Sequence, residues 1–185
     1  MRRLLTLLVT LVAATALVAC GNKEEVVLHG ATEGIYLDLG ELKYQVQISR
    51  QLNPASPEDR AYLVGLDASQ RDLPAGQEWF AVFMRVQNED TRPHPAAREY
   101  TITDTQENKF RPVPLGPENV FAYRAGTVGP ESLIPVADSP AAEGSIQGAL
   151  LLFKIPTRNL ENRPLELEIA SPDTPGLTAT VDLDV

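Results

Sequence analysis

An alternation of apolar and polar residues between Leu42 and Leu52, interrupted only at Arg50, is the feature that most restricts how this chain folds. Successive side chains of a β-strand point to opposite faces, so the alternation predicts a strand with one buried face and one wet face. The segment 53–57 contains two prolines, which donate no hydrogen bond to a sheet, and therefore ends the strand. The same alternation in segments 165–169 and 179–185 predicts two more half-buried strands.

Two other segments, 78–88 and 149–155, each contain an almost continuously apolar run, which in the first extends over 79–86. Their short length and bounding turns favour central strands covered on both faces over helices. We expect these two strands to pack against each other across the core, one from each of two facing sheets. Segments 100–104 and 109–115 predict a hairpin whose second strand is confined to a sheet edge by its prolines. Segment 61–64 fits either a strand or a single helical turn.

Turn-forming residues separate all these segments, and the chain contains 15 prolines and 12 glycines. This composition favours many turns and few long helices. Seven or eight short strands joined by turns are typical of an all-β protein, an antiparallel β-sandwich. The chain after residue 19 has about 165 residues, which predicts a single domain.

The segment 1–19 has the layout of a secretory signal peptide. Arg2 and Arg3 precede an apolar run that extends to Ala16, and small residues stand near its end. A membrane-spanning helix needs about 20 apolar residues. Polar residues follow already at 22–25, so a membrane-spanning segment is the second interpretation.

Residues 17–20, Leu-Val-Ala-Cys, resemble the lipobox of bacterial lipoproteins. The resemblance implies transfer of a diacylglyceryl group to the Cys20 sulfur, cleavage before Cys20 and, usually, acylation of its amino group. Two or three acyl chains anchor a protein durably, whereas one anchors it marginally. The alternative is an ordinary secretory cleavage that leaves Cys20, the only cysteine, unmodified. We therefore expect a lipid-anchored protein on the extracytoplasmic side of a bacterial cell membrane.

The mature chain is strongly acidic. Removal of Arg2 and Arg3 with the signal leaves 14 basic against 25 acidic residues, a formal charge of −11. Such a chain lacks the basic surface of a nucleic-acid binder, and anionic lipid headgroups repel it. Residues 20–33 carry charge without periodicity and predict a short tether, which leaves 34–185 as the folded domain.

Three stretches, Gly76–Asn88, Tyr100–Asp104 with Phe110, and Glu143–Pro156, carry a resemblance to a known family. They are similar to a domain-of-unknown-function family of immunoglobulin-like ectodomains of bacterial lipoproteins, related in fold to secreted mycobacterial immunoprotective antigens. The resemblance covers about residues 40–170. It implies an immunoglobulin-like sandwich and brings no catalytic residues with it.

The two histidines, His29 and His94, give little support for catalysis. His29 lies in the predicted tether and is expected in solvent, and His94 stands between two prolines, where an exposed loop residue is expected. No Gly-x-Ser-x-Gly motif is present, so a serine hydrolase is not expected. A copper or zinc carrier would need more sulfur and imidazole ligands. The oxygen-rich segment 88–90 leaves a calcium site as the alternative to a solvated turn. No metal or cofactor is expected.

Paired carboxylates are the remaining catalytic candidates. Glu166 and Glu168, like Asp182 and Asp184, alternate with apolar residues, so each pair is expected on the solvent face of its strand. An extracytoplasmic hydrolase with an unrecognised carboxylate site is therefore the second hypothesis. The first is a non-enzymatic binding or assembly module of the cell envelope, which would recognise a protein or an envelope polymer.

The segment 116–143 is the candidate binding surface, because a connection of this length is unusual in a compact sandwich. It contains Phe121, Tyr123 and Arg124, residue types that anchor interfaces, and it is less acidic than the rest of the domain. The alternative is that Phe121 and Tyr123 plug the open end of the core.

Overall fold

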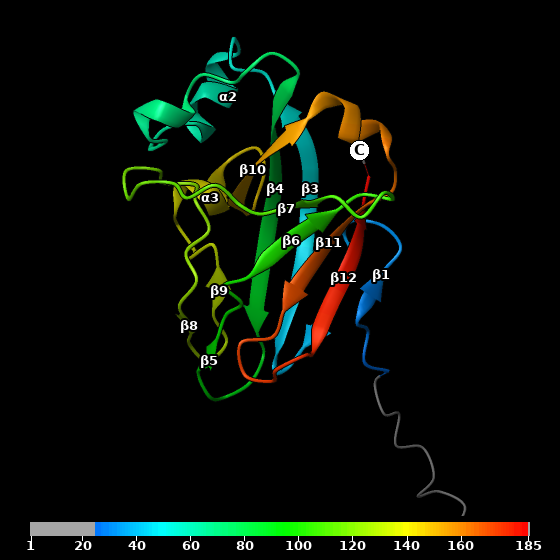
Figure 1. Ribbon diagram of the computed structural model, residues 1–185. Helices are drawn as coiled ribbons and strands as arrows, with labels where there is room; N and C mark the ends of the chain where they lie inside the picture. The colour runs from blue at the N-terminus through cyan, green and yellow to red at the C-terminus, as the bar shows by residue number, and fades with distance from the viewer. Residues whose placement is uncertain (1–24, 185) are drawn as a thin grey trace, which may run out of the picture.

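The computed structural model describes residues 25–184, which form two facing β-sheets (Figure 1). The predicted signal peptide and Cys20 lie outside the described residues. One sheet, the β12 sheet, has the order β1 (His29–Gly30), β12 (Thr178–Leu183), β11 (Leu165–Ala170), β6 (Tyr100–Thr103) and β7 (Lys109–Phe110). The other, the β4 sheet, has the order β10 (Ala149–Pro156), β4 (Gln77–Asn88), β3 (Leu42–Leu52) and β2 (Leu37–Leu39).

Shorter elements complete the described chain. The two-residue strand β9 (Leu133–Ile134) pairs with the end of β4, and β5 (His94–Pro95) pairs with β8 (Thr127–Val128). The helical segments are α2 (Pro57–Tyr62), α3 (Pro140–Glu143), and the 3₁₀ turns Ala68–Gln70 and Thr157–Glu161. Segment 61–64, for which the sequence left strand and helix open, contains the last two residues of α2 and the start of the turn that follows it.

The strand order is that of an immunoglobulin-like sandwich. In such domains the third, sixth and seventh strands share one sheet, and the first, second and fifth share the other. Here β6, β11 and β12 are neighbours in one sheet, and β3, β4 and β10 are neighbours in the other. The predicted all-β antiparallel sandwich is confirmed.

The alternating segments form strands as predicted. β3 spans Leu42–Leu52, and its buried residues alternate with half-buried or exposed ones along most of its length. β11 and β12 alternate in the same way, and β7 closes a hairpin with β6 at the edge of the β12 sheet. Most of the predicted edge strand 109–115 is irregular, since only Lys109 and Phe110 join the ladder.

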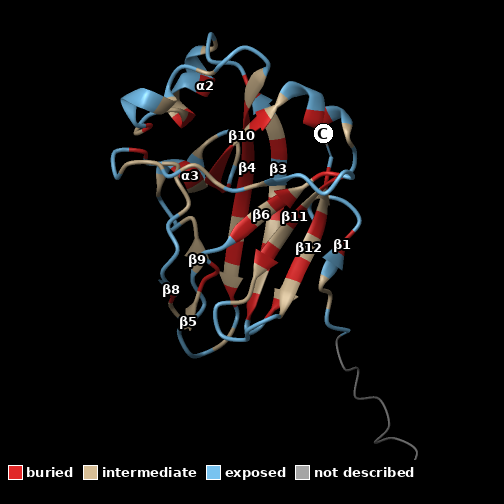
Figure 2. Ribbon diagram, in the orientation of Figure 1, coloured by how far each residue is buried: buried red, intermediate tan, exposed pale blue. Residues whose placement is uncertain are grey.

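One prediction about the apolar segments is wrong. β4 and β10 do not face each other across the core but are hydrogen-bonded neighbours in one sheet, with Phe153 paired to Phe80. Both strands are nevertheless buried on both faces, as Figure 2 shows for β4. The reason is that the outer face of the β4 sheet is itself covered, so neighbouring strands there need apolar residues on both sides.

Two hydrophobic clusters lie on the two sides of the β4 sheet. The inner cluster fills the space between the sheets and includes Phe80, Phe153 and Leu167. The outer cluster includes Trp79 and Leu152 and lies under α2 and the segments that follow β7. Trp79 and Phe153 are both fully buried, as expected for residues of central strands covered on both faces.

The predicted tether needs correction at its C-terminal half. The backbone N–H of Val27 donates to Asp38 Oδ2 at 2.9 Å, and β1 pairs in parallel with β12. Val27 and Leu28 pack against the inner cluster, and Glu33 accepts a hydrogen bond from the Ser49 N–H at 3.0 Å. Residues 27–33 therefore belong to the sandwich, because they cover the edge strands β12 and β2.

Candidate functional site

The free edge of β10 is covered by two irregular segments that leave a cleft between them. On one side Val113 N–H donates to the Leu152 carbonyl at 2.7 Å. On the other, Leu150 exchanges hydrogen bonds with Phe121 and Tyr123 at 2.7 and 2.8 Å. The cleft has a volume of about 230 Å³, and the residues Leu150–Leu152 lie along its floor.

This cleft, called the β10 cleft below, is lined by both apolar and polar groups, and its charged side chains are positive. Pro112, Pro114, Tyr100 and Tyr123 are among the lining residues. Two arginines, Arg98 and Arg124, also line it, and no aspartate or glutamate among residues 25–184 does. In a chain of formal charge −9, a cleft with only basic charges is an exception to the overall composition.

Arg124 is held in place by the loop that it stabilises. Its Nη1 donates to the Leu115 carbonyl at 2.8 Å, and its Nη2 donates to the carbonyls of Gly116 and Asn119 at 2.5 and 3.5 Å. A guanidinium group carries five N–H donors, so these contacts leave donors available. Arg98 is exposed and has no hydrogen-bond or ion-pair partner within residues 25–184.

Three tyrosines fix the backbone beside Arg98. The Tyr44 hydroxyl accepts from the Ala97 N–H at 2.8 Å, and the Tyr123 hydroxyl donates to the Ala97 carbonyl at 2.9 Å. The rings of Tyr100 and Tyr123 pack edge to face with centroids 5.2 Å apart. Burial raises the pKa of Tyr44 to about 12 and the pKa values of Tyr100 and Tyr123 above their ordinary range. All three hydroxyls are therefore neutral, and the arginines are the only charges of the cleft.

The structure places the three predicted partner-binding residues at one point beside β10. Phe121 packs against the outer cluster and Tyr123 against the inner one, so the two rings lie on opposite sides of the β4 sheet. The chain between them is irregular, with a single bridge from Ala122 to Leu150. Phe121 packs against Tyr62 with ring centroids 4.9 Å apart. Phe121 and Tyr123 are both half-buried. This favours the alternative that both rings are packing residues. Arg124 is exposed and lines the cleft, so its role in binding stays a prediction.

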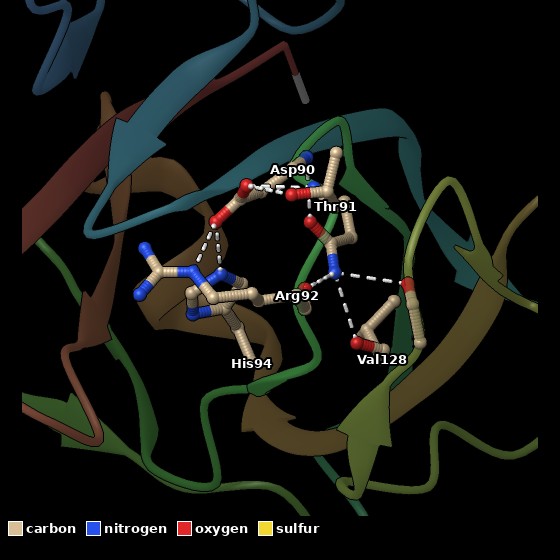
Figure 3. A network of polar contacts seen from close by, with 7 residues as sticks. Asp90, Thr91, Arg92, His94 and Val128 are labelled. Atoms are coloured by element: carbon tan, nitrogen blue, oxygen red, sulfur yellow. Dashed lines mark hydrogen bonds and ion pairs between the residues drawn. The ribbon is translucent and has the colours of Figure 1, made fainter.

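A second polar site lies in the loop after β4 (Figure 3). Asn88 is almost fully buried, and its Nδ2 donates to the carbonyls of Arg92, Val128 and Gly129 at 2.7, 3.0 and 2.9 Å. Its Oδ1 accepts from the Asp90 N–H at 2.9 Å. This one amide therefore joins the end of β4 to the loop and to β8.

Asp90, the residue weighed as a calcium ligand, already has partners for both carboxylate oxygens. Its Oδ1 accepts from the Thr91 N–H at 2.6 Å, and its Oδ2 contacts His94 Nε2 at 2.8 Å and Arg92 Nε at 3.4 Å. The hydrogen bond from His94, followed by that from the Thr91 backbone, lowers the pKa of Asp90 to about 2. No group of three His, Cys, Asp or Glu side chains placed to hold a metal occurs in the described part of the chain.

His94 is less exposed than the sequence suggested. Its side chain is only 16% exposed, because β5 pairs with β8 and Asp90 binds its ring. The only hydroxyl in this network, that of Thr91, contacts Asp90 rather than His94. The Asp90–His94 pair therefore holds the loop between β4 and β5 in place. His29 is exposed, and its Nδ1 lies 2.9 Å from Thr180 Oγ1.

A third polar site, at Asp104, escaped the sequence analysis. The buried Asp104 carboxylate accepts from the backbone N–H groups of Gln106 and Asn108 and from the side-chain amides of Asn159 and Asn162. Burial acts to raise its pKa, but the hydrogen bonds from these amides outweigh burial and hold the pKa well below its usual value. The turn signal at 104–108 was visible in the sequence, whereas the asparagines more than 50 residues away were not predictable partners.

The carboxylate pairs lie on the outer face of the β12 sheet. Glu166 of β11 stands opposite Asp182 of β12 in the ladder, and both are half-buried. Asp184 is exposed and accepts a hydrogen bond from Thr32 Oγ1 at 2.5 Å. Their position on the solvent side follows from the alternation of these strands.

Three solved structures of bacterial proteins are similar to this chain. The yjhA protein of Bacillus subtilis aligns with a TM-score of 0.52 and 12% identity, over 83% of this chain and 99% of that chain. An uncharacterised β-sandwich protein of Clostridium difficile aligns at 0.45 and 9% identity, over 88% and 99%. A candidate lipoprotein of Bacillus subtilis, ycdA, aligns at 0.46 and 10% identity, over 80% of this chain and 38% of that chain. At these identities the first alignment shows a common fold and nothing more.

No family model and no curated protein matches the chain. The resemblance to a lipoprotein ectodomain family therefore stays a prediction, while the β-sandwich architecture is shown. Within residues 25–184 the structure contains no helix that is long and apolar enough to span a membrane.

Proposed function

We propose that this protein is a lipid-anchored extracytoplasmic binding module of the bacterial cell envelope, and that it is not an enzyme. Its lipid would be attached at Cys20, and its ligand site would be the β10 cleft. The observation that carries the proposal is the pair of arginines in a cleft without acidic side chains, on a chain that is otherwise acidic.

The chemistry of the β10 cleft selects one class of ligand. Guanidinium groups bind carboxylate and phosphate with charge-assisted hydrogen bonds, and each such bond contributes about 1.5–3 kcal/mol. The leucines of β10 at 150–152, together with Pro112 and Pro114, provide an apolar surface for the rest of the ligand. The volume of about 230 Å³ fits a small group rather than a folded partner. The ligand is therefore a small anion with an apolar body, presented by an envelope protein or polymer.

Arg98 is suited to ligand binding and Arg124 to positioning. Arg98 has no partner among the described residues, so its side chain can move onto a ligand without breaking an internal bond. Arg124 is already fixed by the carbonyls of Leu115 and Gly116, so it offers its remaining donors from a fixed position.

Nuclear magnetic resonance titration with hexanoate tests this proposal. Hexanoate should shift the amide signals of Val113, Tyr123 and Leu152 in a saturable way. Hexan-1-ol and hexylamine, which have the same apolar body without the negative charge, should bind at least about tenfold more weakly, as expected for the loss of one charge-assisted hydrogen bond.

Two arginine variants distinguish binding of hexanoate in the β10 cleft from a general electrostatic attraction to the protein. Arg98→Gln should weaken hexanoate binding by about tenfold. Arg111→Gln is the matched control, because Arg111 is also exposed, lies just before the cleft wall and does not line the cleft. Equal effects of the two substitutions, or shifts spread over the whole surface, would rule out the β10 cleft as the site.

The anchor has its own test. Cys20→Ala should yield a precursor that is neither acylated nor cleaved at this position, whereas the wild-type protein should remain in the membrane fraction. A wild-type protein recovered as a soluble species with a free thiol would contradict the anchor and leave the cleft unaffected. A hydrolase remains the alternative function, and a carboxylate scan against glycan and peptide substrates would detect it.

A further inference from the structure

The position at which the chain enters the sandwich limits how the domain can sit on a membrane. The first hydrogen bond of the described chain to a neighbouring strand joins Val27 N–H to Asp38 Oδ2. Val27 is the seventh residue after Cys20. Seven extended steps along the chain span at most about 25 Å. An acyl group on Cys20 therefore keeps Val27 within this distance of the lipid surface.

The strand register places Val27 near one end of the sandwich. Asp38 pairs with Lys43 and Lys43 pairs with Gln87, the penultimate residue of β4. The other end of β4, at Gln77, lies beside α2, and β1 enters the sandwich at the end opposite α2 (Figure 1). Ten residues of strand separate Gln77 from Gln87, which is about 33 Å. This length exceeds the reach of the chain from Cys20, so an upright domain cannot bring its α2 end to the membrane.

We propose that the end of the sandwich formed by Val26, Tyr36, Lys43 and residues 89–92 rests on the lipid surface; we call it the basal end. The proposal depends on acylation of Cys20, which is part of the proposed function. It adds a second interaction surface to the β10 cleft, and its partner is a bilayer of zwitterionic lipid.

The side chains of the basal end suit the headgroup region of a bilayer. Val26 is 66% exposed and Tyr36 is 39% exposed, and both line one surface hollow. Tyrosine is enriched at membrane–water interfaces, because its ring is apolar and its hydroxyl binds water or headgroups. Exposed apolar side chains at the point where an acylated chain would reach the bilayer are therefore expected to insert into the interface.

The charges of the basal end explain the choice of zwitterionic lipid. Lys43 binds Asp38 at 3.3 Å and Glu89 at 3.7 Å, and Glu25 lies in the same hollow. Arg92 is the second cation of this end, but the four acids Glu25, Asp38, Glu89 and Asp90 outnumber the two cations. Anionic headgroups would therefore repel this surface. Two side chains add little affinity alone, so the acyl anchor is needed to hold the surface at a high effective concentration near the bilayer.

This orientation leaves the β10 cleft accessible. The cleft floor at Leu151 pairs with Val82, five strand residues above Gln87 and so about 17 Å further from the lipid. A ligand carried by another envelope component could reach the cleft while the basal end stays on the membrane.

Paramagnetic relaxation in lipid nanodiscs tests the orientation. The protein purified with its native lipid is placed in phosphatidylcholine nanodiscs that contain a lipid with a gadolinium-chelate headgroup. Amide relaxation enhancement falls steeply with distance from the metal. It should be several-fold stronger at Val26, Tyr36, Lys43 and residues 89–92 than at Val64 and Val120. Equal enhancement at both sets, or stronger enhancement at Val64 and Val120, would overturn the proposal.

A second preparation makes the result independent of acylation in the cell. The chain from Cys20 onward is coupled through its only thiol to a maleimide lipid, so that the anchor is imposed chemically. If the native protein carries no lipid but the coupled protein shows the predicted pattern, the anchor is wrong and the basal end is right. If both are anchored and neither shows the pattern, the basal end is wrong and the anchor is right.

A pair of double variants distinguishes contact from mere proximity. Val26→Ser with Tyr36→Ser should reduce the contrast between the two ends, because the domain then tilts freely on its anchor. Val64→Ser with Val120→Ser is the matched control, because these valines are 45% and 56% exposed and should not face the membrane. An unchanged contrast in the first double variant would show that the basal end makes no contact with lipid.

Discussion

On the inner side of β4, Phe80 and Val82 face the regular strands of the β12 sheet. On its outer side, Trp79 and Phe83 face α2 and irregular segments of chain. The inner cluster is enclosed by ladders whose geometry is fixed along their length. The outer cluster is closed by pieces of chain that polar contacts hold in place. Equal burial can therefore come from a rigid or an adjustable cover.

Asp59 and Asn119 are the polar contacts that fix the outer cover. Asp59 is buried, binds the Arg50 guanidinium with both carboxylate oxygens, and accepts from the Asn53 N–H at 2.7 Å. Asn119 is buried and donates to the carbonyls of Tyr62 and Val64 at 2.9 and 2.7 Å. The first contact ties α2 to β3, and the second ties the end of α2 to the segment that follows β7.

The largest difference between the two sides should come from neighbouring residues of β10. Phe153 faces the inner cluster and Leu152 the outer one, and both are buried. Phe153→Ala should lower the free energy of unfolding by about 3–5 kcal/mol. Leu152→Ala should cost less, about 2–3 kcal/mol, because an adjustable cover can collapse into the space. Urea denaturation measures both. Equal or reversed costs would show that the outer cover is as rigid as the inner sheet.

The next largest effect should be a local loss of stability at low pH that depends on Asp59. The hydrogen bond from Arg50 is the main cause that lowers the pKa of Asp59. A carboxylate with a lowered folded pKa stabilises the fold fully above its unfolded value, near pH 4, and loses this contribution as the pH falls through the folded pKa. The protection of amides 60–66 against hydrogen exchange, relative to the intrinsic exchange rate at the same pH, should therefore fall below about pH 4, while the amides of β4 stay protected.

Asp59→Asn supplies the control for this pH effect. It should weaken the attachment of α2 by about 1.5–3 kcal/mol at neutral pH and remove the acid dependence. Acid-dependent exchange that persists in the variant would assign the effect to another carboxylate.

The smallest effect is expected at Tyr123, which lies where the outer cover of the β4 sheet adjoins the β10 cleft. Tyr123→Phe removes the hydrogen bond to the Ala97 carbonyl and should cost about 1 kcal/mol. Hexanoate binding should be retained, because the ring and both arginines remain. Loss of binding with unchanged stability would instead make the Tyr123 hydroxyl a ligand contact, as the sequence first suggested for this residue.

Individual strands were determined by the sequence through local periodicity. The alternation from Leu42 to Leu52 matches β3, and the apolar run 78–88 matches β4. Alternation is a local property, because it depends only on which side of its own strand a residue faces. The antiparallel sandwich followed from the number and spacing of such segments. The expected acyl site at Cys20 rests on a local motif in the same way.

Which segments of the chain lie side by side was decided only by the tertiary structure. The sequence could not show that β10 lies beside β4, because an apolar run reports burial on both faces but not which elements provide it. It could not show that residues 27–33 join the sandwich, since two-residue strands carry no periodicity. The β10 cleft brings Arg98 and Arg124 together from separate segments. Such a site depends on packing between residues far apart in the sequence, so local sequence patterns cannot predict it.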